Sequence, residues 1–173
     1  EADSLNASIL GPDVDPGMPE FDIFVKEVQR EITTKAGQKC TAVRRIIVPE
    51  NRIEAVQQAL ISRLEKNVIG DPRSKETRMG SLASQIQVER LEENIERLKL
   101  SQEVVYGDLR DFAINGGDKD KGAFVSPTLF LNKDPFKNTD VHEVECFGPV
   151  STLMPYTDLA QAAELANMGK GSL

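Results

Sequence analysis

The chain has 173 residues, of which 28% are charged and 39% hydrophobic, and its formal net charge is −7. This length suits one domain with a buried core, and the acidic balance argues against a nucleic-acid surface, which needs clustered basic residues. No apolar run approaches the roughly 18 residues of a membrane span, and two cysteines are too few for a disulfide framework. We therefore expect a cytoplasmic protein with neither a nucleic-acid nor a membrane partner.

The first predicted helix follows a loop. Residues 11–19 are rich in proline, glycine and aspartate, which is typical of a loop. From Phe21 onward apolar residues recur at helical spacing. This pattern predicts an amphipathic helix to about Ala36, with Gly37 as its stop.

The middle of the chain alternates between strand and helix signals. An apolar run predicts a strand at 43–48, and a second amphipathic helix is expected over 49–64. Residues 67–81 form a polar connection. A third helix is expected over 84–100, because Ser84 and Gln87 have the spacing of a capping box.

The last part of the chain is rich in predicted strands. One or two short strands are expected within 103–115, and another at 124–131, where Pro127 indicates a sheet edge or a bulge. A strand at 150–156 precedes a last helix that Asp158 is expected to cap. Helices that alternate with strands predict an α/β fold, a three-layer, mostly parallel sheet with helices on both faces.

Cys40 is the main candidate for chemistry. It lies between a predicted helix and a predicted strand, where a side chain can point into a cleft and backbone N–H groups are free. Only a thiolate attacks carbonyl carbons, and it needs access and nearby positive charge. Lys39, Arg44 and Arg45 could supply that charge, although the sequence leaves their direction open. Taken alone, an isolated cysteine is more often structural.

Cys146 and His142 are weaker candidates for a catalytic or metal-binding role. Cys146 is expected to be a small buried hydrophobe, and His142 is expected at the surface. Because His142 is the only histidine, neither a Cys–His pair nor a histidine-rich metal site is easily assembled, and we expect no metal.

Three sequence blocks occur in order: residues 37–40 before the strand at 43–48, then 122–130, then 145–150. Together they resemble the aldehyde dehydrogenase superfamily over essentially the whole chain. The resemblance implies the fold of that family's catalytic domain. Without it, residues 145–149 would be interpreted as a turn with one anchoring aromatic ring.

The amino-acid sequences of two further stretches, 1–6 and 40–50, resemble one branch of the family more closely than the others. They resemble the dehydrogenases of phenylacetate degradation, with semialdehyde dehydrogenases that act on CoA thioesters in benzoate degradation as near neighbours. The substrate implied is an aldehyde, with a CoA-linked semialdehyde as the main candidate.

The resemblance also implies roles for individual residues. Cys40 would attack the aldehyde, hydride would pass to NADP or NAD, and water would hydrolyse the resulting thioester. Glu1 matches the position of the general base, although both glycines of the family pattern are missing after it. Glu145 matches the glutamate that binds the nicotinamide ribose, and Phe147 matches the ring beside the nicotinamide.

The family's domain order implies a fragment. Residues 1–173 would be the catalytic domain, without the dinucleotide-binding domain and the C-terminal oligomerisation segment of a homo-oligomeric parent. The sequence begins at Glu1 and ends without a terminating signal, which fits a fragment. Because the cofactor would then have only part of its site, we expect the isolated chain to be inactive. Two alternatives stay open: a noncatalytic scaffold with a structural Cys40, and an interaction module in which Cys40 is a redox switch.

Overall fold

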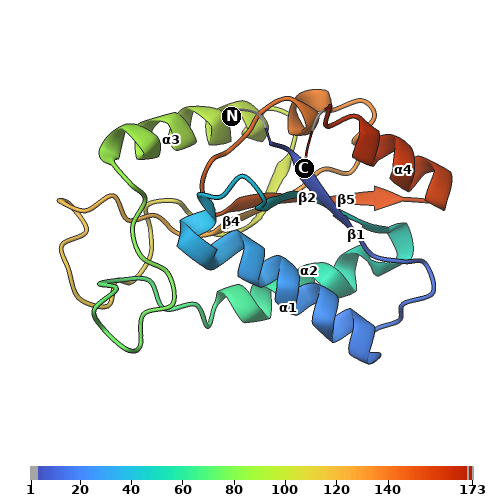
Figure 1. Cartoon of the computed structure of the whole chain (residues 1–173). Helices are drawn as coiled ribbons and strands as arrows, with labels where there is room; N and C mark the ends of the chain where they lie inside the picture. The colour runs from blue at the N-terminus through green and yellow to red at the C-terminus, as the bar shows by residue number, and fades with distance from the viewer. Residues whose placement is uncertain (1–3, 171, 173) are drawn as a thin grey trace.

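The computed structural model describes residues 4–170 and 172, and places a five-stranded sheet between two layers of helices (Figure 1). The strand order is β1-β2-β5-β4-β3. The strands are β1 (Asn6–Ile9), β2 (Val43–Pro49), β3 (Glu103–Tyr106), β4 (Thr128–Leu131) and β5 (Val150–Tyr156). Three of the four strand pairs are parallel, and only β3 runs antiparallel to its neighbour β4. The predicted mostly parallel sheet is confirmed.

Two helices cover each face of the sheet (Figure 1). Helices α1 (Pro19–Thr33) and α2 (Ile53–Leu64) lie on one face, and α3 (Gln85–Lys99) and α4 (Leu159–Asn167) lie on the other. Three short 3₁₀ turns, η1 (Thr34–Gly37), η2 (Glu50–Arg52) and η3 (Thr139–His142), complete the helical segments. Within the described residues, no helix has the length and apolar character needed to cross a membrane.

The side chains of β2 point alternately to the two faces of the sheet and so pack against both helical layers. Ile46 and Val48 pack into the core between the sheet and α1 and α2, whereas Ile47 packs into the core beneath α4. Successive side chains of a strand point to opposite faces. Because both faces are covered, the strand is apolar on both sides and its sequence is a continuous hydrophobic run.

The predicted helix starts are confirmed by their caps. The Ser84 side chain accepts a hydrogen bond from the backbone N–H of Gln87 at the start of α3. The Asp158 carboxylate accepts one from the N–H of Gln161 at 2.9 Å at the start of α4. Each cap satisfies an N–H that has no partner within the helix.

The structure corrects the first predicted helix and adds a strand before it. Helix α1 ends at Thr33, and the backbone then turns through left-handed conformations at Lys35 and Ala36, with φ of 53° and 51°. Strand β1 was not predicted. It has only four residues, too few for a clear alternation of apolar and polar side chains.

The strand predicted at 124–131 is also shorter than expected. Strand β4 begins at Thr128 and lies between β5 and β3, so the prediction that Pro127 marks an edge or bulge is wrong. Pro127 precedes the strand, where its missing N–H removes no ladder hydrogen bond. The sheet edges are β1 and β3 instead.

His142 is buried, with 3% of its surface exposed, so the prediction of a surface histidine is wrong. Its Nδ1 lies 3.1 Å from Arg45 Nη1, and its Nε2 lies 3.0 Å from the Pro135 carbonyl oxygen. Because a guanidinium can only donate, Nδ1 accepts and Nε2–H donates. Burial lowers the pKa of His142, and the neighbouring charge of Arg45 lowers it further.

Candidate active site

The segment that carries Cys40 is a short loop, residues 38–42, between η1 and β2. The chain enters this loop through Gly37, whose φ of +70° favours glycine. Cys40 is exposed, and its thiol is free. The structure thus presents the candidate nucleophile at the surface, at the junction where the sequence predicted it.

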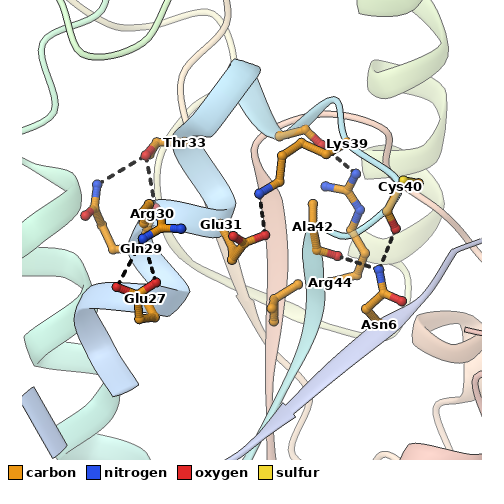
Figure 2. Close-up of polar contacts among 12 residues, drawn as sticks. Asn6, Glu27, Gln29, Arg30, Glu31, Thr33, Lys39, Cys40, Ala42 and Arg44 are labelled. Atoms are coloured by element: carbon orange, nitrogen blue, oxygen red, sulfur yellow. Dashed lines mark hydrogen bonds and ion pairs between the residues drawn. The ribbon is translucent and has the colours of Figure 1, made fainter. Parts of the chain in front are cut away.

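Asn6 fixes the backbone of this loop (Figure 2). Its side-chain Nδ2 donates to the Cys40 carbonyl oxygen at 2.6 Å and to the Ala42 carbonyl oxygen at 3.1 Å. Asn6 is 5% exposed and belongs to β1. A buried amide that bridges two carbonyl groups leaves the loop little freedom to rotate around Cys40.

Two features of the loop bear on the reactivity of the thiol. Among the described residues, the backbone N–H groups of Cys40 and Thr41 donate no hydrogen bond, so they can bind an anion that forms beside the sulfur. The Lys39 ammonium lies 2.6 Å from the Glu31 carboxylate (Figure 2). Its positive charge is therefore already paired.

Arg44 joins the Cys40 loop to the turn that contains Glu145 and Phe147. It is 4% exposed, and its guanidinium donates to the carbonyl oxygens of Gly37 and Gly148, both at 2.6 Å. The same group lies 5.7 Å from the centroid of the Phe147 ring, within cation–π range. Burial lowers the pKa of Arg44, and the negative charge of Glu145 opposes that shift.

The two segments also meet through their backbones. A Cβ atom on Gly37 would lie 2.1 Å from the Gly148 carbonyl oxygen, which no side chain could tolerate. Glycine at position 37 is therefore required by close approach as well as by its φ.

Helix α3 packs against the turn at 145–149 and supports it. The side-chain Nδ2 of Asn94 donates to the Glu145 carbonyl oxygen at 2.8 Å, and a Cβ on Gly148 would meet Leu91 Cδ2 at 2.6 Å. Phe147 stays 37% exposed, and Glu145 is half-buried. This turn therefore presents an aromatic ring and a carboxylate on a rigid support.

Cys146 lies in the same turn but is buried, as predicted, with 3% of its surface exposed. Burial raises the pKa of its thiol to about 12. A neutral, enclosed thiol is a poor nucleophile, so the two cysteines of the chain lie in opposite environments.

Of the four predicted site residues, Cys40 lies on one and Glu145 and Phe147 lie on the other of two segments that meet through Gly37, Arg44 and Gly148. Glu1 lies outside the described residues. Arg45, which was a candidate source of charge for Cys40, instead donates to the Leu165 and Ala166 carbonyl oxygens at the end of α4. Asn6 was not identified from the sequence because its partners are 34 and 36 residues away.

Comparison with known proteins places the chain in a family. The sequence model of the Aldehyde dehydrogenase family matches residues 2–173. A 3,4-dehydroadipyl-CoA semialdehyde dehydrogenase of Aromatoleum evansii is 45% identical over 173 residues, which is 100% of this chain and 34% of that protein. A putative aldehyde dehydrogenase of Staphylococcus haemolyticus is 32% identical over 88% of this chain and 32% of its own length. The chain thus spans about a third of the length of the curated relatives it matches.

Solved structures agree on the fold. A betaine aldehyde dehydrogenase of Staphylococcus aureus in complex with NAD⁺ superposes with a TM-score of 0.81 at 29% identity, over 94% of this chain and 31% of that chain. An aldehyde dehydrogenase of Pseudomonas syringae in complex with NAD⁺ and octanal gives a TM-score of 0.78 at 26% identity, over 95% and 32%.

Proposed function

We propose, from the premise that this chain belongs to the aldehyde dehydrogenase family, that it forms the catalytic domain of an enzyme that oxidises an aldehyde to a carboxylic acid. The observation that supports this most is the placement of an exposed thiol at Cys40 beside the Glu145–Phe147 turn, with Arg44 bonded to both segments.

The first step we propose is attack by Cys40. Its thiolate forms a C–S bond to the aldehyde carbon, and the carbonyl electron pair moves to the oxygen to give a thiohemiacetal anion. The free N–H of Cys40 can donate to that oxygen. Asn6 supports the loop on the other side of the sulfur, because it bonds the Cys40 carbonyl oxygen and so orients the peptide group that carries the Thr41 N–H.

The turn at 145–149 has groups that suit the nicotinamide end of NAD or NADP. Glu145 carries a half-buried carboxylate, which can accept hydrogen bonds from ribose hydroxyls, and Phe147 carries an exposed ring that can pack against a flat heterocycle. When bound, the cofactor would accept the hydride of the thiohemiacetal, which leaves a thioester on Cys40. The choice between NAD and NADP would be made in a separate dinucleotide-binding domain, which we place outside residues 1–173.

The second step we propose is hydrolysis of the thioester. Water attacks the acyl carbon, the C–S bond breaks, and the acid leaves while Cys40 is regenerated as a thiolate. A general base must take the proton of the water. We assign this role to Glu1 on its sequence position alone, since it lies outside the described residues.

The substrate class we propose is a CoA-linked semialdehyde from the breakdown of aromatic compounds. Its support is the 45% identical relative, whose name gives a CoA semialdehyde as its substrate. We favour phenylacetate degradation as the pathway because of the resemblance of residues 1–6 and 40–50 to its dehydrogenases. The pathway of the 45% identical relative is the alternative. We further propose a cytoplasmic, homo-oligomeric parent enzyme, and the isolated chain is expected to be inactive.

The test is turnover by the parent enzyme with a CoA-linked semialdehyde, followed as NADH or NADPH formation. The Cys40→Ser variant should lose activity by at least about a thousandfold, whereas Cys146→Ser should keep most of it. Retention of most activity by Cys40→Ser would remove the assignment of the nucleophile and favour the noncatalytic scaffold.

A further inference from the structure

A groove between α1 and α2 lies outside the site described above. It has a volume of about 710 Å³. Five of the residues that line it are cationic, namely Lys26, Arg30, Arg63, Lys66 and Arg78. No Asp or Glu is among its described lining residues, although the protein as a whole carries a net charge of −7. The groove is therefore positively charged, although the protein as a whole is negatively charged.

Three of the five cations, Lys26, Arg30 and Arg63, lie on the two helices, and Lys66 and Arg78 lie in the segment after α2. Residues three and four positions apart lie on the same helical face, and the lining residues of both helices follow this spacing. The stripes are Lys26, Gln29, Arg30 and Thr33 on α1, and Ala59, Ser62 and Arg63 on α2, with Lys66 in the turn that follows α2. The opposite faces of both helices pack into the core, so the two stripes are held beside each other by a rigid layer.

Much of this charge is available to a ligand. Lys26, Arg63 and Lys66 form no ion pair with any described residue. Arg30 pairs with Glu27 at 3.0 Å, but both side chains are largely exposed, and such pairs are weak. Asn67, which also lines the groove, has a shielded side-chain Nδ2 with no acceptor among the described residues.

The groove ends beside the segment that leads to Cys40. Thr33 and Thr34 line it where α1 passes into η1, and Figure 2 shows Arg30 and Thr33 on the helix that precedes the Cys40 loop. Only residues 35–39 separate Thr34 from Cys40, so the chain between them spans at most about 20 Å. A ligand anchored in the groove by its charged end could send a long flexible arm toward the thiol.

We propose that this groove binds the phosphate groups of a coenzyme A thioester, whose pantetheine arm carries the aldehyde to Cys40. The proposal rests on the proposed function and adds the site at which the substrate is recognised. Coenzyme A fits because its phosphates all lie at one end and its acyl group lies at the other. Lysine and arginine side chains are the groups that proteins use to bind phosphate.

The test is isothermal titration of the 173-residue chain with coenzyme A, dephospho-coenzyme A, pantetheine and NADP. Coenzyme A should bind, dephospho-coenzyme A should bind more weakly, and pantetheine, which lacks phosphate, should show no measurable binding. Affinity for coenzyme A should fall as NaCl is raised, because salt screens exposed charges. The variant Arg63→Glu/Lys66→Glu should weaken coenzyme A binding by about tenfold or more.

The control is Arg90→Glu/Lys137→Glu, which changes the net charge equally at exposed positions outside the groove. It should bind coenzyme A within about twofold of the parent chain. Equal weakening by both double variants, undiminished binding by Arg63→Glu/Lys66→Glu, or NADP binding as tightly as coenzyme A would each overturn the proposal.

The parent enzyme separates this proposal from the proposed function. Arg63→Glu/Lys66→Glu should raise KM for the CoA-linked semialdehyde and lower kcat much less. An unchanged KM in an enzyme that still oxidises this substrate would overturn the groove alone. An absence of aldehyde oxidation by the unaltered enzyme would overturn the proposed function, while the titrations above would still decide whether the groove binds phosphate.

Discussion

Arg44→Met should destabilise the chain because it removes the group that joins the Cys40 loop to the 145–149 turn. The two hydrogen bonds at 2.6 Å, to the carbonyl oxygens of Gly37 and Gly148, would be lost together. Each hydrogen bond from a charged donor contributes a net ~1.5–3 kcal/mol, so the pair contributes roughly 3–6 kcal/mol. Removal of a buried charge relieves its desolvation penalty and offsets part of this. We expect a net loss of about 3 kcal/mol in the free energy of unfolding.

The measurement is equilibrium unfolding in urea, with Tm as a second readout. A loss of that size lowers Tm by roughly 6–12 °C in a chain of this length. The matched control is Arg90→Met, which alters an exposed arginine on α3 and should change stability by less than about 0.5 kcal/mol. If Arg44→Met also stayed within about 0.5 kcal/mol of the parent chain, the claim that Arg44 holds the two segments together would be refuted.

Three further predictions concern individual residues. His142 has a pKa lowered by burial, so the unfolded chain binds its proton more tightly, and the stability present above pH 6.5 should be lost progressively as the pH falls below 6.5. His142→Gln should flatten that dependence below pH 6.5 in urea titrations, and an unchanged slope would contradict the burial of the imidazole beside Arg45. Asn6→Ala should speed the alkylation of Cys40 by iodoacetamide or change its pH profile, because it frees the loop, and Asn6→Asp should not restore the parent behaviour, since a carboxylate cannot donate to two carbonyl groups. In the unaltered chain, peptide mapping after brief alkylation should find the label on Cys40 and not on Cys146, and labelling of both cysteines at similar rates would contradict their opposite environments.

The features that the sequence predicted well are those with a local cause. The amphipathic spacing of α1, α2 and α3 places apolar residues on one side, and the caps at Ser84 and Asp158 act over three residues. Residues 37–40 and 145–149 could be identified because each motif is continuous in the sequence.

The features that the sequence did not predict depend on contacts between distant residues. Asn6 is 34 residues from Cys40, and Arg44 is 104 residues from Gly148. His142 is polar and follows a loop, so a surface position was a reasonable prediction, yet a buried guanidinium at Arg45 gives it a partner inside the protein. Pro127 predicts a sheet edge or a bulge when the strand is assumed to begin at Phe124, whereas it lies just before the interior strand β4 begins.

The account depends most on a covalent bond between Cys40 and the substrate. The most direct measurement is mass spectrometry of the parent enzyme, quenched in acid during turnover with a semialdehyde and NAD or NADP, then digested and mapped. We predict an acyl group, with the mass of the product acid less water, on the peptide that contains Cys40. An acyl group on Cys146 instead, or steady turnover without any adduct on Cys40 under conditions that preserve thioesters, would contradict the account.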